Sequence, residues 1–172
     1  MLPLIIFVGY VFAQSLLFAD KSATPSSATE KRKDAKAMDE DEAREVWARY
    51  DADVKQRRLE EASRMHEALR ASRLNDTTTP FTLSYKCFGT EEVYAGKLAD
   101  VFAEYDETHV LPDADGKYWW VFGCAEVEGT DKEKLLAWVE YVCDVANANG
   151  LTFSSWKIEY LDSKKVWDSQ DF

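Results

Sequence analysis

The chain has 172 residues, of which 46% are hydrophobic and 13% aromatic, a size that fits one folded domain with appendages better than two large domains. Thirty-two acidic residues against 21 basic ones give a net charge of -11. This disfavours direct binding of DNA or RNA, because such a surface needs clustered cations. Three widely spaced cysteines and two histidines predict neither a disulfide framework nor a zinc cluster.

The first 19 residues form an apolar run. Residues 1–19, MLPLIIFVGYVFAQSLLFA, contain no charged side chain and approach the length that a helix needs to cross a bilayer. A retained membrane anchor and a cleaved signal peptide both fit this run. The nearest cations follow it, so a retained anchor would leave the rest of the chain in the cytoplasm. We expect a single-pass inner-membrane protein, and the alternative is export to the periplasm or the medium after signal cleavage.

A spacer and a charged stretch come next. Residues 20–29 are small and polar with one proline, which is typical of a flexible spacer. Residues 30–74 contain neither glycine nor proline and predict a long charged helix. Its apolar residues form two short stripes at helical spacing: Val46, Trp47, Tyr50 and Val54, then Ala62, Met65 and Leu69. We interpret this stretch as a helical stalk whose apolar residues dock locally, and a coiled-coil dimer is the alternative.

Residues 80–172 predict a separate α+β domain. Alternating apolar residues indicate a strand at 81–87, a hairpin with arms at 108–111 and 117–127, and a last strand at 151–161. Helical periodicity indicates one helix after Gly89 and a second that stops at Asn149-Gly150. The order is strand, helix, strand, strand, helix, strand. It predicts a ferredoxin-like βαββαβ domain, whose antiparallel sheet carries two helices on one face.

The strand at 117–127 is apolar on both sides, so its orientation decides which aromatic residues face the core. We expect the set that contains Trp120 and Phe122 to lie opposite the set that contains Trp119, and we expect Trp119 to be available on the exposed sheet face. The alternative is that the long helix folds back and covers this face through Trp47 and Tyr50.

Signals for catalysis are weak. His109 follows Glu107 and could act as a general base, but no nucleophile or second histidine stands nearby in the sequence. The stretch Asp113 to Gly116 resembles the start of a calcium loop, but the ligand spacing then breaks off, so we interpret it as a turn. No common cofactor or nucleotide motif is present. We therefore expect a protein that is not an enzyme and uses no cofactor or metal.

A resemblance to a known family adds to this interpretation. The segment YWWVFGCAEVEGTDKEKLLAWVEYVCDVANANGLTFSSWKIEYLD, residues 118–162, resembles the second half of the RraB family of protein regulators of ribonuclease E. The likeness rests on a hydrophobic strand with a cysteine at Cys124, a helix that ends in Ala146, and a final strand that carries Trp156 and Tyr160. The first strand and helix fit the same layout, so the resemblance covers residues 80–162.

The resemblance implies a small acidic ferredoxin-like protein that binds the non-catalytic part of ribonuclease E and lowers its activity without acting on RNA. Charge points the same way independently, because residues 80–172 hold 18 acidic residues, 8 lysines and no arginine, which should attract a basic protein segment. We expect a regulatory protein-binding domain; the alternative is an exported binding or immunity-type module with an unrelated partner. The expected partner contacts are Glu91, Glu92, Asp100, Trp119 and Trp156.

Overall fold

A long helix precedes the sheet, as the lack of glycine and proline predicts. The computed structural model describes residues 39–72, 80–104, 107–129, 131–160 and 163–172, and in the first of these ranges helix α2 spans Glu40–Ala71. The expected start of this helix near residue 30, the spacer at 20–29 and the apolar run at 1–19 lie outside the described residues. Of the helices that are described, none is long and apolar enough to cross a membrane.

The domain after α2 is α+β, as predicted, and follows the predicted order of elements. In chain order these are β1 (Pro80–Gly89), α3 (Glu92–Phe102), β2 (Glu107–Pro112), β3 (Trp119–Glu128), α4 (Lys132–Ala148) and β4 (Thr152–Tyr160). A short strand that we did not predict, β5 (Val166–Asp168), and a 3-10 turn (Ser169–Asp171) end the chain.

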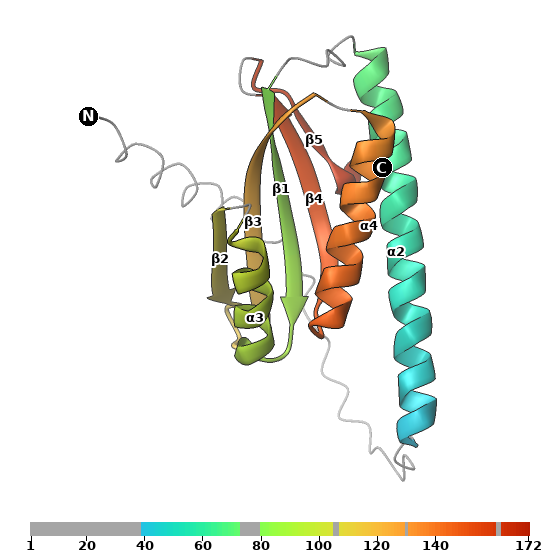
Figure 1. Cartoon of the computed structure of the whole chain (residues 1–172), viewed down its shortest axis with the longest axis vertical. Coiled ribbons are helices and arrows are strands. Elements are labelled where there is room, and N and C mark those ends of the chain that lie inside the picture. Colours follow the sequence, from blue (N-terminus) through green and yellow to red (C-terminus); the bar gives the residue numbers. More distant parts are fainter. Residues whose placement is uncertain (1–38, 73–79, 105–106, 130, 161–162) are drawn as a thin grey trace, which may run out of the picture. The chain divides into compact units, whose positions relative to one another are not determined.

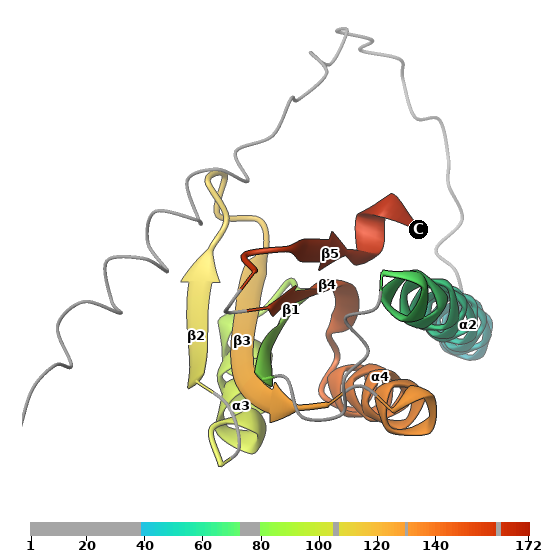
Figure 2. The same ribbon diagram turned by 90° about the horizontal axis from the view of Figure 1, so that it is seen from above.

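The sheet has five strands in the order β2-β3-β1-β4-β5, and every neighbouring pair is antiparallel. The order of the first four strands is compatible with a ferredoxin-like arrangement. Helices α3 and α4 lie on the same face of the sheet (Figure 2). All described residues belong to one compact unit that begins at Met38.

The ends of α4 follow from local chemistry. The Asp131 carboxylate accepts hydrogen bonds from the backbone N–H groups of Glu133 and Lys134 at 2.8 and 3.3 Å, and so satisfies donors that the first turn of a helix leaves free. At the other end Gly150 has a φ of 73°, a conformation that costs glycine little. The chain therefore leaves the helix at the predicted Asn149-Gly150 stop.

The core lies between the sheet and its helices. Strand β1 alternates between half-buried and buried residues, and its buried members Phe81, Leu83, Tyr85 and Cys87 face α3 and α4. The other face of the sheet therefore receives Thr82, Ser84, Lys86 and Phe88, because successive strand residues point to opposite sides. We call this second side the open face, since no described helix lies on it (Figure 2).

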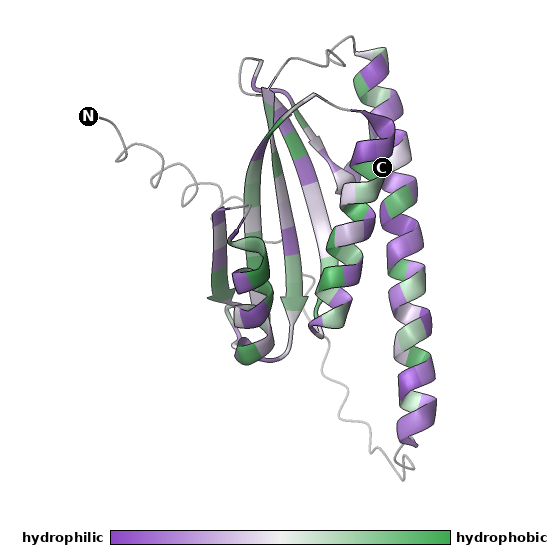
Figure 3. Ribbon diagram, viewed as in Figure 1, coloured by the Kyte–Doolittle hydropathy of each residue, from purple (hydrophilic) through white to green (hydrophobic). Residues whose placement is uncertain are grey.

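Helix α2 covers the β4 side of the sheet and not the open face. Its second part packs beside α4, with Val54, Ala62, Met65, His66 and Leu69 buried (Figures 1 and 2). The Lys55 ammonium binds one carboxylate oxygen of Glu140 and both carboxylate oxygens of Asp144 at 2.9 Å each, which fixes α2 to α4. Hydrophilic residues predominate along α2 (Figure 3). Trp47 and Tyr50 are 63% and 39% exposed, so the alternative in which they cover the open face is wrong.

Candidate protein-binding surface

Cross-strand register brings large side chains together on the open face. Phe88 of β1 lies opposite Trp120 of β3, and Leu111 of β2 lies opposite Trp120 from the other side. One ladder step further, Phe122 is flanked by Lys86 and His109. Opposite residues in an antiparallel ladder project to the same face, so three neighbouring strands contribute to one surface.

Four aromatic rings form a continuous row there, which we call the open-face aromatic cluster: Phe88, Tyr118, Trp120 and Phe122. Ring centroids lie 5.7 Å apart for Phe88 and Tyr118, 5.4 Å for Phe88 and Trp120, and 6.3 Å for Trp120 and Phe122. Tyr118 is 40% exposed and the neighbouring Leu111 is 41% exposed, while the other three rings are half-buried. A group of this kind on a surface is typical of an interaction site.

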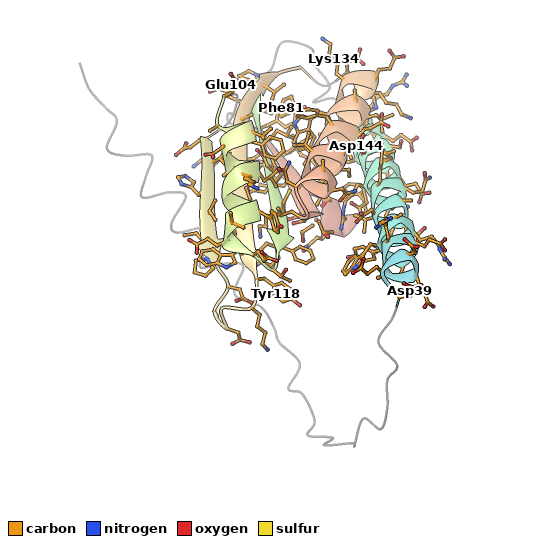
Figure 4. All side chains as sticks on the ribbon, turned by 60° about the horizontal axis from the view of Figure 1, so that its bottom comes forward. Asp39, Phe81, Glu104, Tyr118, Lys134 and Asp144 are labelled. Atoms are coloured by element: carbon orange, nitrogen blue, oxygen red, sulfur yellow. The ribbon has the colours of Figure 1, made fainter. Side chains whose placement is uncertain are left out.

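Acidic residues lie on the loops at the Tyr118 end of the domain. Figure 4 places Tyr118 at the end opposite Glu104, which follows α3, so α3 begins at the Tyr118 end. Glu91 and Glu92, at the start of α3, are exposed. Asp113 and Asp115 are in the β2–β3 turn, where Asp113 accepts hydrogen bonds from the backbone N–H groups of Lys117 and Tyr118 at 2.8 and 3.3 Å. This confirms the turn that the sequence predicts.

The side of the open face towards β4 and β5 is polar and internally paired. The Lys86 ammonium lies 5.7 Å from the centroid of the Phe122 ring, and burial lowers its pKa, against the opposing effect of Asp168. Lys157 and Glu159 of β4 form an ion pair of 3.7 Å. The aromatic cluster therefore has mixed, locally balanced charge on this side. At its Tyr118 end Lys117 pairs with Asp115 at 3.7 Å, and Glu91, Glu92 and Asp113 leave an excess of negative charge.

The structure separates the five predicted contact residues into two groups. Glu91, Glu92 and Asp100 are exposed on α3 or at its start. Trp119 is half-buried and packs against the core on the helix-covered side, and Trp156 is 1% exposed. The expectation of Trp119 on the exposed face is thus wrong, and Trp156 has almost no surface to offer a partner. The acidic residues of α3 lie on the helix-covered side of the sheet, whereas the aromatic cluster lies on the open face.

Sequence reasoning missed the aromatic cluster because it chose the wrong side of β3. The residues of β3 that face the core are small apart from Trp119 and include Val121, Gly123 and Ala125, whereas Trp120 and Phe122 face outward. The hydrophobic pattern alone favours the larger set for the core. Gly123 is the signal that was available, because a large residue on a neighbouring strand can fill the space that a glycine leaves.

Groups for catalysis or metal binding do not converge on this surface. His109 Nε2 lies 3.3 Å from Glu107 Oε1, with both side chains about half exposed at 49% and 58%. Among the residues that the structure describes, no three His, Cys, Asp or Glu side chains form a possible metal site. The arrangement can supply aromatic faces, carboxylates and a shallow apolar surface, which are means of binding.

The sequence matches no protein-family model, and a search of curated proteins finds no match either.

Proposed function

We propose that this chain is a non-enzymatic regulatory domain that binds a basic segment of another protein on the open-face aromatic cluster. The observation that carries the proposal is the row of four rings on a sheet face that no described helix covers. Aromatic anchors of this type provide most of the affinity at protein interfaces. The resemblance to the RraB family makes the basic non-catalytic region of ribonuclease E the candidate partner. It also supports a ferredoxin-like fold for the α+β domain.

A guanidinium-rich segment fits the chemistry of the surface. An arginine stacks on aromatic rings through its planar cation and pairs with carboxylates in a forked geometry. Trp120 and Tyr118 offer the ring faces, and Glu91 and Glu92 offer carboxylates at the same end of the domain. The excess of 18 acidic residues over 8 lysines in residues 80–172 speeds the encounter with a cation and repels nucleic acid.

The first test measures peptide affinity. The full chain should bind a short arginine-rich peptide and not a glutamate-rich peptide of the same length. Replacing Trp120 or Phe122 with alanine should weaken binding about tenfold or more, since an anchor ring is lost. Tyr141→Ala removes an aromatic ring of α4 that is 45% exposed and belongs to neither proposed surface, and it serves as the matched control. Equal binding by Trp120→Ala and Tyr141→Ala would remove the aromatic cluster from the proposal.

A second test uses charge. Glu91→Lys with Glu92→Lys should slow association and weaken binding, and the effect should shrink as salt rises. The control is Glu104→Lys with Glu133→Lys, which changes the net charge equally. Glu104 and the neighbour of Glu133, Lys134, lie at the far end of the domain (Figure 4). If single-stranded RNA competed with the peptide at a similar affinity, the surface would be a nucleic-acid site and the proposal would fail.

The cellular location belongs to the same proposal. We propose that residues 1–19 are retained as an anchor in the inner membrane and hold the domain in the cytoplasm, where a ribonuclease can be reached. Amino-terminal sequencing of the membrane fraction should then give Met1 or Leu2. A mature protein that begins at Gln14 or Asp20 would instead support the exported module, with an unrelated partner.

A further inference from the structure

The first part of α2 extends beyond the domain. The helix begins at Glu40, but its first buried residue is Val54, and Figure 1 shows α2 continuing past the end of α4. We call residues 40–53 the overhang. It carries Trp47, which is 63% exposed and has its ring centroid 5.8 Å from that of Tyr50. Trp47 continues the helix face that is buried further along. We call the continuation of this face past the point where the domain covers it the stripe.

The charges on this stripe are complementary to those of a second copy that runs in the opposite direction. Five residues at spacings of three and four fall within about 80° of one another around the helix: Glu40, Arg44, Trp47, Asp51 and Lys55. In chain order they are negative, positive, aromatic, negative and positive. A second copy that runs in the opposite direction places Lys55 against Glu40 and Asp51 against Arg44. It also places Trp47 against Trp47.

We propose that two copies of this chain form a dimer through antiparallel pairing of their overhangs, with the two-fold axis close to Trp47. A two-fold interface makes each contact twice, so the dimer gains two Arg44–Asp51 pairs and one pair of stacked tryptophans. At two further positions Glu40 approaches Lys55, where it exchanges with the carboxylates that bind Lys55 within one chain. The occupant of the stripe is a second copy, because a helix with the reverse charge order is complementary to these positions and this chain provides one. The dimer is independent of the aromatic cluster on the open face.

The contacts that these charged residues make within one chain can be exchanged for contacts across the dimer. Asp51 is half-buried, burial raises its pKa, and no described residue forms an ion pair or a side-chain hydrogen bond with it. Arg44 binds Asp41 at 3.3 Å, but the two side chains are 76% and 83% exposed, and an exposed pair of this kind contributes little. Lys55 contacts Glu140 and both carboxylate oxygens of Asp144 at 2.9 Å, so a contact with Glu40 of the second copy takes the place of one of these.

The test measures the mass of the full chain in solution. Sedimentation in a density-matched detergent, which does not add to the buoyant mass, should give a dimer for the wild type. Arg44→Asp places like charges at both symmetric contacts and should raise the dissociation constant tenfold or more. Arg49→Asp is the matched control: Arg49 lies on the opposite side of the helix, where its contact is Glu45 at 3.9 Å. It should leave the dimer unchanged.

A charge exchange identifies the direction of pairing. Asp51→Arg alone should also weaken the dimer, and Arg44→Asp combined with Asp51→Arg should restore it. Positions 44 and 51 are seven residues apart, about 10 Å along one helix, so the rescue cannot arise within a chain. Far-UV circular dichroism confirms that each variant is folded. A monomeric wild type, a dimer insensitive to Arg44→Asp, or a failed rescue would each overturn the proposal.

Discussion

The ring of Tyr85 lies against Gly123, the residue opposite it in the β1/β3 ladder, and a Cβ atom at position 123 would overlap the ring. Tyr85 is 2% exposed, and its ring centroid lies 5.1 Å from that of Phe102 and 5.8 Å from that of Trp138. The glycine thus makes room in the middle of the sheet for a ring that contacts both covering helices.

Gly123→Ala should therefore destabilise the domain. We expect the free energy of unfolding to fall by about 1–3 kcal/mol, the usual cost of overpacking a core, as measured by urea titration. Gly96→Ala in α3 is the control, because a Cβ atom there meets nothing within 4 Å, and alanine in a helix is favoured over glycine by about 1 kcal/mol. If Gly123→Ala left the free energy of unfolding unchanged, the Tyr85 ring would be able to move aside at no cost.

The N-terminal caps of α4 and α2 predict different responses to an aspartate-to-alanine substitution. Asp131→Ala removes a carboxylate that accepts two backbone hydrogen bonds and should lower the free energy of unfolding by about 0.5–2 kcal/mol. Asp39→Ala removes an aspartate at the cap of α2 that makes no such bond and should change stability much less. Thermal unfolding of both variants side by side checks this difference, and equal effects would contradict it.

Tyr160 carries a buried hydroxyl that has no hydrogen-bond partner among the described residues. Tyr160→Phe keeps the ring contacts with Phe81 and Trp167 and removes an unsatisfied polar group, whose burial costs about 1–3 kcal/mol. The variant should be as stable as the wild type or more so in a urea titration. Tyr94→Phe on the exposed side of α3 provides the reference. A clear loss of stability in Tyr160→Phe would reveal a hydrogen-bond partner for the hydroxyl.

Buried thiols predict a loss of stability in alkaline solution. Burial raises the pKa of the Cys87 thiol and raises that of Cys143 to about 12. Thiols of the unfolded chain ionise near pH 8.5, so the folded state binds more protons above that pH. Each thiol contributes its full stability below about pH 8.5 and loses up to about 1.4 kcal/mol per pH unit above it. Cys143→Ala should reduce this slope between about pH 9 and 10; an unchanged slope would contradict the assignment.

Most elements of the domain were predictable because their signals are local. Alternation fixes β1, helical periodicity fixes α3 and α4, and Asn149-Gly150 fixes the end of α4. The order of the elements then leaves few possible topologies. Strand β5 escaped prediction because it has three residues and depends on the free edge of β4 rather than on any pattern of its own.

The binding surface was harder to predict than the fold. The acidic residues at the start of α3 are visible in the sequence, since exposure of Glu91 and Glu92 follows from their charge. The aromatic cluster depends on which side of β3 meets the helices, and Trp119 and Trp120 are adjacent residues of the same type. The fit between Tyr85 and Gly123 favours the side of β3 that carries Trp119 for the core, and that fit joins residues far apart in the chain.

The two outer edges of the sheet are built differently, and this limits how the protein can aggregate. On the β4 side, β5 pairs with Lys157–Glu159 and Arg58 of α2 donates a hydrogen bond from Nε to the Phe153 carbonyl oxygen at 3.3 Å. Among the described strands, β2 and β5 are the two outer ones, and β5 offers an edge of only three residues. Fibrillar stacking of intact molecules needs two edges on each molecule that can pair, and very short edge strands pair poorly. Strand-to-strand association through β2 therefore meets only a short opposite edge, which favours discrete species over filaments.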